Sequence, residues 1–572
     1  MEEADLVIIG AGIFGLTTAH TYHRLHPSSK MLILDSSPSI GGPWAPQRIF
    51  PGLKTNNLLG MYEHPDFPMN EQKFRVKRGE HIDAANMFDY ITAFVDWADI
   101  KQFIRLRTNV ETIEKDEEGK GWILHFAPSS LLEKRETQIK ARKLVIAVGT
   151  TNTPLLPEYP TSPNFRLLVV HARDFPTHYP DIVKSRAHTV VVGSGKSAWD
   201  VAYACATQPS STATILIRPD GNGPVWMTPT HVTPLGLWLE KLVHTRFFGF
   251  MSPCPWAATS GLEGWLRSFF QRTWLGRKIT TGFWNILGED AIALNGLDKH
   301  PETKKLRPWR SAFEVGNALS IHNYPTSFFD LVRQGRIKVL IDDIAALQDT
   351  QQVLLKSGSV LQADAVVCAT GWQKGYTFRF QPQELEKELG VPSSQPLIDE
   401  ERSLVESAEE TLFAQFPYLE ERDTTRVAHP DATLRSTPQQ PHQQQDQPYR
   451  LHRFITPPRL LQTRNIAFAG ALHCLGSFPC AYIQALWITS FLDGSMALPQ
   501  SPPSAILQET YRDTQYCVLR GAMSYGHTLP DLVFDTLPYF DTLLADLGVE
   551  GRGRRKGGAL SECMEERRPA SS

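Results

Sequence analysis

The fold is decided by the stretch DLVIIGAGIFGLTTAHTYHRLH, residues 5–26. Its first five residues form an apolar run without a polar face, which suits a buried strand of a parallel sheet. A glycine-rich turn and a helix-compatible pattern follow at once. A second apolar run, MLIL, then ends at Asp35. This order of strand, glycine turn, helix, strand and acid predicts a βαβ unit that binds a dinucleotide.

The three glycines of the turn GAGIFG have separate physical tasks. Gly10 allows the chain to turn tightly off the strand, and Gly12 lets a pyrophosphate approach the N-terminus of the helix. Gly15 lets the helix pack closely against the strand. Asp35 lies 20 residues after Gly15, where an acid can bind ribose hydroxyls. An acid disfavours a 2′-phosphate, so this first site suits FAD or NAD better than NADP.

Composition and charge limit the classes of partner. At 572 residues the chain can bury large cores and hold at least two domains. Lys and Arg number 58 against 61 Asp and Glu, so no strong field indicates a nucleic-acid partner. The seven cysteines include no CxxC pair, and the opening MEEAD shows no secretory signal. We expect a reduced, cytoplasmic protein without a metal cluster or a dithiol redox motif.

One long apolar segment has two interpretations, a membrane span or part of the folded core. Residues 466–492 contain no Asp, Glu, Lys or Arg and resemble a membrane span in a hydropathy window. The middle of the segment, HCLGSFPC, is poor helix. We therefore predict a buried strand and loop followed by a helix, rather than a transmembrane segment.

Two short motifs after Asp35 are candidates for ligand contact. Gly42 and Trp44 belong to GGPW, whose glycines would bring the backbone close to a ligand, with the indole as a flat wall. The alternative is a surface turn with a buried tryptophan. Thr55 and Asn56 lie in a turn-rich segment, where asparagine side chains can bind a flavin edge or a substrate, or can cap local backbone.

A second glycine motif follows another apolar strand. The run TVVV leads into GSGKSAWDVAYA, where Gly193, Gly195 and Ala198 fill the three glycine or alanine places. The next strand, TATILIR, ends in Arg218 instead of an acid. A cation there can pair with the 2′-phosphate of NADP, and Lys196 is a second candidate. Because a base replaces the acid at this position, the second site favours NADPH over NADH. The alternative is that Arg218 is only a solvated residue at the end of the strand.

Two unlike nucleotide sites predict an α/β chain of two Rossmann-like domains, with the NADPH domain inserted in the FAD domain. One site would hold a bound flavin and the other an exchangeable NADPH, so that hydride passes from nicotinamide to flavin. The expected boundaries are residues 1–160 and 371–525 for the FAD domain, 161–370 for the NADPH domain, and 526–572 for a C-terminal extension.

Three further segments are set apart by composition. Residues 230–310 are rich in aromatic side chains. This composition predicts a helical insertion that caps the fold with a core of its own. The alternatives are that the insertion covers the active site or contacts a membrane surface. Residues 426–450 are polar and rich in Pro and Gln, which predicts a disordered loop. The tail from Glu550 is expected to be disordered as well.

With these motifs in hand, the chain resembles the flavin-containing monooxygenases over most of residues 1–525. GAGIFG matches the family's FAD fingerprint, and GSGKSA matches the NADPH one. Between these two fingerprints the family has a signature, whose places are occupied here by Phe165, His171 and Phe175. The related Baeyer–Villiger enzymes usually carry Trp at the place of Phe175. GGPW is similar to a flavin-proximal GGxW, and ATGW at residues 369–372 to a linker motif. RNIAFAGA and QALW resemble the C-terminal flavin-contact region.

The chain also departs from the family pattern. Leu167 replaces the signature glycine, Leu59 and Gly60 replace a Lys-Glu pair after the active-site Asn, and Ile483 replaces a Glu before Gln-Ala. By analogy, these departures indicate a divergent branch, like those that tailor fungal secondary metabolites.

The resemblance implies an oxygenation cycle. NADPH reduces FAD, the reduced flavin adds O₂ at its 4a carbon, and the hydroperoxide transfers one oxygen atom to a small organic substrate. Baeyer–Villiger insertion or epoxidation on the same scaffold is one alternative. The other is an FAD-binding protein without oxygenation, acting as an NADPH oxidase or a scaffold. Substrate identity and oligomeric state stay open.

The resemblance and the motifs together define the expected site. Asn56 is the expected catalytic residue, through hydrogen bonds to the flavin or to the oxygen site, and no metal is expected. The expected cofactor-binding residues are Gly10, Gly12, Ile13, Phe14, Gly15, Asp35, Gly42, Trp44, Thr55, Asn56, Gly193, Gly195, Lys196, Ser197, Arg218, Thr370, Gly371 and Gln484.

Overall fold

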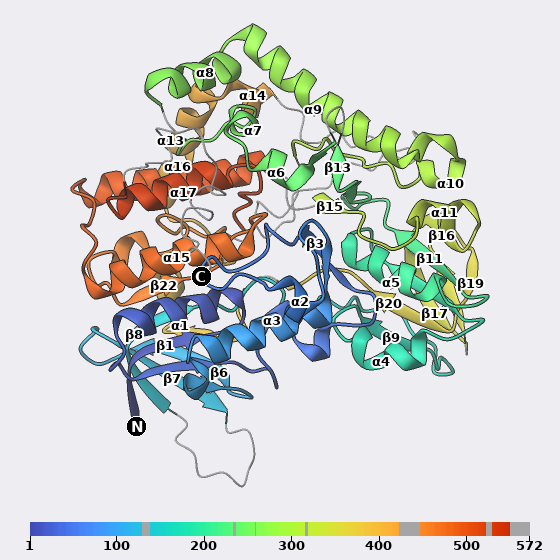
Figure 1. Cartoon of the computed structure of the whole chain (residues 1–572), viewed down its shortest axis with the longest axis horizontal. Coiled ribbons are helices and arrows are strands. Elements are labelled where there is room, and N and C mark those ends of the chain that lie inside the picture. The colour runs from blue at the N-terminus through green and yellow to red at the C-terminus, as the bar shows by residue number, and fades with distance from the viewer. Residues whose placement is uncertain are drawn as a thin grey trace.

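Two sheets and a helical layer organise the molecule (Figure 1). The computed structural model describes residues 1–127, 138–232, 236–257, 259–314, 319–349, 351–373, 375–421, 447–521 and 529–549. In Figure 1 the first sheet lies at the lower left, the second at the right, and the helices of the insertion run along the top.

The first sheet contains the βαβ unit predicted from the glycine turn. Among the described residues its strands are β1 (Glu2–Ile9), β2 (Met31–Leu34), β5 (Ile104–Arg105), β6 (Asn109–Lys115), β7 (Trp122–Ala127), β8 (Gln138–Ile146), β21 (Arg379–Gln381) and β22 (Ile466–Phe468). Their order is β21-β6-β7-β8-β1-β2-β5. The long strand β8 pairs with β7 along its first half and with β22 along its second, so segments over 300 residues apart lie side by side.

Helices cover this sheet because its central strands are apolar on both faces. α1 (Ile13–Leu25) follows β1, α3 (Ala84–Trp97) lies beside it, and α15 (Ser477–Asp493) packs against α1. The predicted strand, loop and helix over residues 466–492 are therefore confirmed as β22 and α15. A search of the described helices finds none with the length and apolar character needed to cross a membrane.

The second sheet is parallel throughout. Its strands are β9 (Leu168–His171), β10 (His188–Val192), β11 (Thr212–Ile217), β16 (Ile337–Ile341) and β20 (Ala365–Cys368), in the order β16-β11-β10-β20-β9. α5 (Lys196–Ala206) follows β10, and α4 (Phe175–Ile182) and α11 (Phe328–Arg333) complete the unit. A three-stranded antiparallel sheet of β17 (Ile344–Gln348), β18 (Gln352–Leu355) and β19 (Val360–Gln362) packs against it.

These strands fall between β8 and β21 in the chain, so the second Rossmann-like unit is inserted in the first. The expected fold class is confirmed, including the helical, aromatic-rich insertion. That insertion consists of α6 (Leu239–Val243), α7 (Arg246–Phe250), α8 (Gly261–Arg272), α9 (Trp274–Asn295) and α10 (Pro301–Lys304). Trp284 of α9 and Phe248 of α7 form its core together with Phe534, which comes from beyond the second sheet.

Smaller elements connect the units. They are β3 (Lys54–Leu58) with β4 (His81–Asp83), α2 (Glu71–Phe74), β12 (Trp226–Thr228) with β15 (Leu319–Ile321), β13 (His231–Val232) with β14 (Leu237–Trp238), and the helices α12 (Leu385–Leu389), α13 (Asp399–Gln415) and α14 (Pro417–Glu421). α16 (Pro503–Arg520) and α17 (Thr536–Asp546) close the described chain, and Tyr539 and Leu543 of α17 are buried in the core of the first unit.

The structure corrects the predicted disordered loop at its C-terminal end. Residues 426–446, and the tail from Glu550, lie outside the described residues. Arg450, however, is only 7% exposed, and its guanidinium donates to Thr514 Oγ1 at 2.8 Å and to Gln515 Oε1 at 2.9 Å. The guanidinium is buried because α16 supplies both acceptors, a long-range contact that composition does not reveal.

Candidate functional site

The first glycine turn leaves open space at the N-terminus of α1. Gly12 is the N-cap, and a Cβ placed on it would meet only Gly42 Cα, at 3.9 Å. The GGPW loop faces the turn because the Gly41 amide donates to the Ala11 carbonyl at 2.9 Å. By contrast, a Cβ on Gly15 would lie 1.9 Å from the Gly10 carbonyl oxygen, as close helix–strand packing requires. The turn fits a pyrophosphate at a helix N-terminus.

Asp35 lies where a ribose-binding acid is expected. One carboxylate oxygen accepts from the Ala11 amide at 2.7 Å, and the other accepts from the Ser37 amide at 2.8 Å. These bonds hold the carboxylate beside the glycine turn. Each oxygen has further lone pairs for sugar hydroxyls. The turn and the acid together fit the adenosine diphosphate half of FAD.

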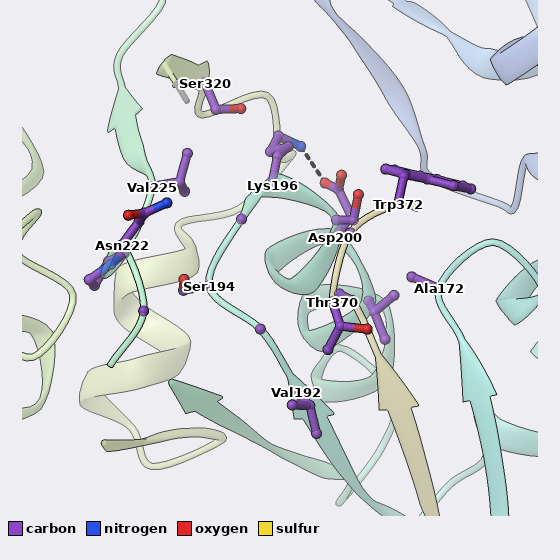
Figure 2. Close-up of a pocket in the computed structure, with 18 of the residues that line it drawn as sticks. Ala172, Val192, Ser194, Lys196, Asp200, Asn222, Val225, Ser320, Thr370 and Trp372 are labelled. Atoms are coloured by element: carbon purple, nitrogen blue, oxygen red, sulfur yellow. Dashed lines mark hydrogen bonds and ion pairs between the residues drawn. The ribbon is translucent and has the colours of Figure 1, made fainter. Parts of the chain in front are cut away.

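The second glycine motif opens on a cavity of about 490 Å³ at the carboxyl ends of the second sheet. Figure 2 shows Ser194 on the loop after β10, Lys196 at the start of α5, Thr370 and Trp372 after β20, and Asn222 across from them. Gly193, Gly195, Ser197 and Gly371 line the same cavity. A Cβ on Gly195 would meet nothing within 4 Å, so the backbone at the N-terminus of α5 is open to a ligand.

Residues of the first unit close the other side of this cavity. Pro43 of GGPW and Asn56 of β3 line it, although they lie in the FAD half of the chain. The cavity therefore joins the second glycine motif to the two motifs expected to flank the flavin. Ligands of open α/β sheets bind at this edge, outside the carboxyl ends of the strands.

The lining of the cavity is strongly cationic. Its cations are Arg48, Arg173, Lys196, Arg218 and Arg310, and the acid that lines it is Asp200. Burial lowers the pKa of Arg48 to about 10 and also lowers that of Arg310. Cations placed in a cleft and partly removed from water favour a ligand that carries several negative charges.

The two expected phosphate contacts differ in their surroundings. The Lys196 ammonium is bonded to Asp200 (Figure 2). It also lies 4.6 Å from the centre of the Tyr324 ring. The Tyr324 hydroxyl donates to the same Asp200 oxygen at 3.0 Å. Arg218 follows β11 and is exposed at the cavity wall. Arg218 is therefore better placed than Lys196 to meet a 2′-phosphate.

A small cluster joins the two units beside the cavity. His171 Nε2 lies 2.9 Å from the Gly371 carbonyl oxygen, and the His171 ring lies 5.1 Å from Trp372. The Arg48 guanidinium covers Trp372 at 5.0 Å. Thr370 donates to the Leu155 carbonyl at 2.5 Å, which fixes the turn after β20. The cluster positions the ATGW turn against the first unit.

Strand β3 turns neighbouring side chains to different environments. Asn56 is exposed to the cavity. Thr55 is fully buried, where its hydroxyl donates to the Asn57 carbonyl at 2.6 Å and accepts from the Ile82 amide at 3.0 Å. Thr55 therefore supports the strand, and Asn56 is the side chain that can reach a ligand.

Asn57 binds a carboxylate that comes from the helical insertion. Its amide donates to Glu240 Oε1 at 2.5 Å and to the Leu475 carbonyl at 2.8 Å. The other Glu240 oxygen accepts from the Leu58 amide at 3.3 Å. Burial raises the pKa of Glu240 to about 7, while the bond from Asn57 opposes that rise. The insertion thus places a titratable group against the two residues that follow Asn56 on β3.

Several expected cofactor contacts are packed into the protein. Gln484 is fully buried; its carbonyl accepts from the Gly470 amide at 2.9 Å and its amide donates to Tyr539 at 2.7 Å. Ile13 belongs to the core, and the Phe14 ring lies against Gly470. Trp44 is half-buried, and its indole donates to the Tyr62 hydroxyl at 3.3 Å. Their contact with a cofactor therefore stays a prediction.

Comparison with known proteins places the chain in a family. Residues 7–234 match a family model described as pyridine nucleotide-disulphide oxidoreductase. FAD-dependent monooxygenase rstn6 of Aspergillus nomiae NRRL is 31% identical, over 98% of this chain and 95% of that protein. FAD-dependent monooxygenase resA of Aspergillus sclerotiorum is 30% identical, over 99% and 96%. The chain belongs to the FAD-dependent monooxygenases.

Two solved structures share the fold of this monooxygenase. Cyclohexanone monooxygenase from Rhodococcus sp. Phi1 bound to NADP⁺ matches with a TM-score of 0.58 and 14% identity, covering 96% of this chain and 98% of that one. S-allyl-L-cysteine S-oxygenase from Allium sativum matches with a TM-score of 0.51 and 14% identity, over 99% and 94%.

Sequence reasoning about the monooxygenase missed three side chains at the site. Arg48 and Arg310 line the cavity, and Glu240 binds the neighbour of Asn56. None of the three belongs to a glycine motif. The only signal for Glu240 is a single acid in the otherwise apolar or basic segment WLEKLVH.

Proposed function

We propose that this FAD-dependent monooxygenase takes hydride from NADPH and transfers one oxygen atom from O₂ to a small organic substrate, in the tailoring of a secondary metabolite. The observation that carries the proposal is the shared cavity. Its lining combines the second glycine motif and Arg218 with Pro43 and Asn56 of the FAD unit. A nicotinamide bound there is directed toward the flavin's expected position.

The residues have distinct parts in the proposal. The turn at Gly12 and the carboxylate of Asp35 bind the adenosine diphosphate half of FAD. The open backbone at Gly195 and Ser197 binds the pyrophosphate of NADPH, and Arg218 binds its 2′-phosphate. FAD, when bound, supplies the chemistry that accepts hydride and activates O₂. Asn56 hydrogen-bonds at the reacting site, with its strand held in place by Asn57 and Glu240.

The resemblance in the sequence leaves the substrate class open and supports one branch of the fold over another. Phe175, in place of the Trp usual in Baeyer–Villiger enzymes, favours the flavin-containing monooxygenases. Two fold neighbours differ in chemistry by their names: one is a cyclohexanone monooxygenase and the other an S-oxygenase. Insertion beside a ketone and epoxidation are therefore outcomes that the same experiment must distinguish.

The test is product analysis with isotope-labelled O₂. Purified protein containing FAD is supplied with NADPH and a panel of amines, sulfides, ketones and alkenes. We expect one compound class to gain a single labelled oxygen atom, with NADPH consumed in equal amount. If every compound leaves NADPH oxidation coupled only to hydrogen peroxide, the protein is an NADPH oxidase. If NADPH does not reduce the bound flavin at all, the scaffold alternative holds.

A further inference from the structure

The outer edge of the helical insertion carries large apolar side chains in contact with solvent. On α9, Ile286 is 72% exposed, Leu275 52% and Ile279 42%. On α8, Leu262 is 74% exposed and Trp265 62%. Isolated exposed apolar residues are ordinary, but a group of this size on two adjacent helices marks an interaction surface.

The spacing on α9 shows that its exposed apolar residues lie on one face. Leu275, Ile279 and Ile286 recur at intervals of four and seven residues, which places them on one side of a helix. The opposite side, with Thr280 and Trp284, is buried against the rest of the insertion. α9 is thus apolar on two faces, of which the described chain covers one. Its 22 residues give a face about 33 Å long.

The face lies at the rim of the molecule. Figure 1 shows α8 and α9 along the top edge, opposite the first sheet, with α7 and α14 next to α8. The cavity lining reaches the same insertion at Pro308 and Arg310, which follow α10. No residue of α8 or α9 lines the cavity, so a flat partner meets the two helices without touching it.

Aromatic and charged residues around the face indicate its partner. Trp265 and Trp274 are 62% and 68% exposed, and indole rings favour the boundary between lipid and water. Arg272 and Lys278 are exposed at the corner between α8 and α9. The acids Glu263 and Glu289 are paired with arginines, at 3.4 Å from Arg267 and 2.6 Å from Arg307. Asp290 also lies on α9, four residues after Ile286, so α8 and α9 together carry four Lys or Arg residues against three Asp or Glu. The face therefore combines apolar residues and indoles with a small positive excess.

We propose that α8 and α9 dock this monooxygenase onto the surface of an anionic lipid bilayer. The helices lie in the plane of the interface, with Leu275, Ile279 and Ile286 immersed among the acyl chains and Arg272 and Lys278 at the headgroups. The exposed indoles of Trp265 and Trp274 favour the boundary between lipid and water over a second copy as the occupant. The inference does not depend on the proposed reaction.

The test is co-sedimentation of the full-length, FAD-containing protein with lipid vesicles. Vesicles of phosphatidylcholine mixed with phosphatidylserine are compared with vesicles of phosphatidylcholine alone. We expect binding to the mixed vesicles, and a loss of at least about tenfold in apparent affinity for the Ile279→Glu/Ile286→Glu variant. Both side chains are exposed, so bound FAD should be retained and shows that the variant is folded.

Two further variants test whether the effect is specific to the insertion and whether it depends on the cations. Leu25→Glu is the matched control, because Leu25 is 58% exposed at the end of α1, far from the insertion; it should bind like the unmodified protein. Arg272→Ser/Lys278→Ser should lose about fivefold in affinity per cation for the anionic vesicles only.

The proposal has clear contrary outcomes. It is wrong if the unmodified protein does not sediment with the mixed vesicles, or if Leu25→Glu weakens binding as much as the paired glutamates do. Sedimentation velocity without lipid tests the other occupant. A dimer that Ile279→Glu/Ile286→Glu converts to a monomer would assign the face to a contact between copies.

Discussion

Glu240 is the residue whose charge most directly couples the insertion to the expected reacting site. It is 7% exposed, and both of its carboxylate oxygens accept hydrogen bonds from β3. Burial raises its pKa from 4.5 to about 7, so the folded protein binds a proton that the unfolded chain releases between these pH values. Stability from this group is fully present below pH 4.5 and falls as pH rises toward 7.

Replacement of Glu240 by Gln should remove this pH dependence. The amide keeps an acceptor for β3 but cannot ionise. We expect the variant to gain stability over the unmodified protein as pH rises from 4.5 to about 7, by up to about 3 kcal/mol. Thermal unfolding of both proteins across this range measures the difference. A difference that does not change with pH contradicts the assignment, and Glu118→Gln, at a side chain that is 68% exposed between β6 and β7, is the control.

Arg218 is the residue on which nucleotide choice depends. A guanidinium can bind a 2′-phosphate bidentately, and charge-assisted bonds in a partly desolvated cleft contribute about 1.5–3 kcal/mol. We expect Arg218→Ala to lower the ratio of flavin-reduction efficiencies, NADPH over NADH, by about 10- to 150-fold. Rapid-mixing absorbance of the flavin gives both rates.

The control for Arg218 is Arg142→Ala, on β8, where the side chain is 79% exposed. It should leave the ratio unchanged. Equal weakening of both nucleotides by Arg218→Ala would make Arg218 a structural residue. No weakening of either would transfer the role to Lys196 or Arg310.

At the scale of elements, two helix N-termini carry the nucleotide sites. α1 and α5 each begin at a glycine without a side-chain cap, Gly12 and Gly195, so their first amides are available to phosphate oxygens. The surroundings differ, since Gly12 faces the GGPW loop whereas Gly195 opens on the cavity. We therefore expect that a substitution at one glycine abolishes binding at that site and leaves the other site able to bind its nucleotide.

Valine at each glycine tests this independence. Gly12→Val places a β-branched side chain in the 3.9 Å gap to Gly42, and we expect purified protein without FAD. Gly195→Val meets nothing within 4 Å, so it should fold, retain FAD and lose at least about tenfold in NADPH affinity. Flavin absorbance and nucleotide titration are the measurements. A yellow, fully loaded Gly12→Val protein would refute the first site.

At the scale of the whole molecule, the C-terminal segment joins the insertion to the FAD unit. Arg520 of α16 and Asp535 are 3% and 0% exposed in their side chains, with Arg520 Nε 3.7 Å from Asp535 Oδ2. Arg520 also donates to the Phe313 carbonyl at 2.6 Å, and Tyr516 donates to Asp535 at 2.9 Å. Residues near 313, 516 and 535 are thus connected through one buried polar network.

Breaking this network from one side should be costly. Arg520→Met leaves the Asp535 carboxylate buried without its cation, and we expect a loss of about 3–5 kcal/mol in the free energy of unfolding. Arg520→Met/Asp535→Leu removes both charges and should recover a large part of that loss. Denaturant unfolding monitored by tryptophan fluorescence measures both variants. A single variant that loses less than about 1 kcal/mol would show that the pair does not hold the units together.

The sequence alone determined the two βαβ units, the glycine turns, the strand and helix over residues 466–492, and the helical insertion. These features follow from short-range causes: apolar periodicity, glycines in the turns and an acid or base at the end of the next strand. All of those residues are close together in the chain, so their pattern is visible before the chain folds.

Only the tertiary structure decided which side chains reach the cavity. Thr55 and Asn56 are neighbours, yet the packing of β3 against β4 buries the first and exposes the second. Glu240 meets Asn57 across 183 residues of chain, and Arg450 is buried by acceptors on α16. Contacts of this kind depend on how distant elements pack, because burial and hydrogen-bond partners are set by the assembled core rather than by local pattern.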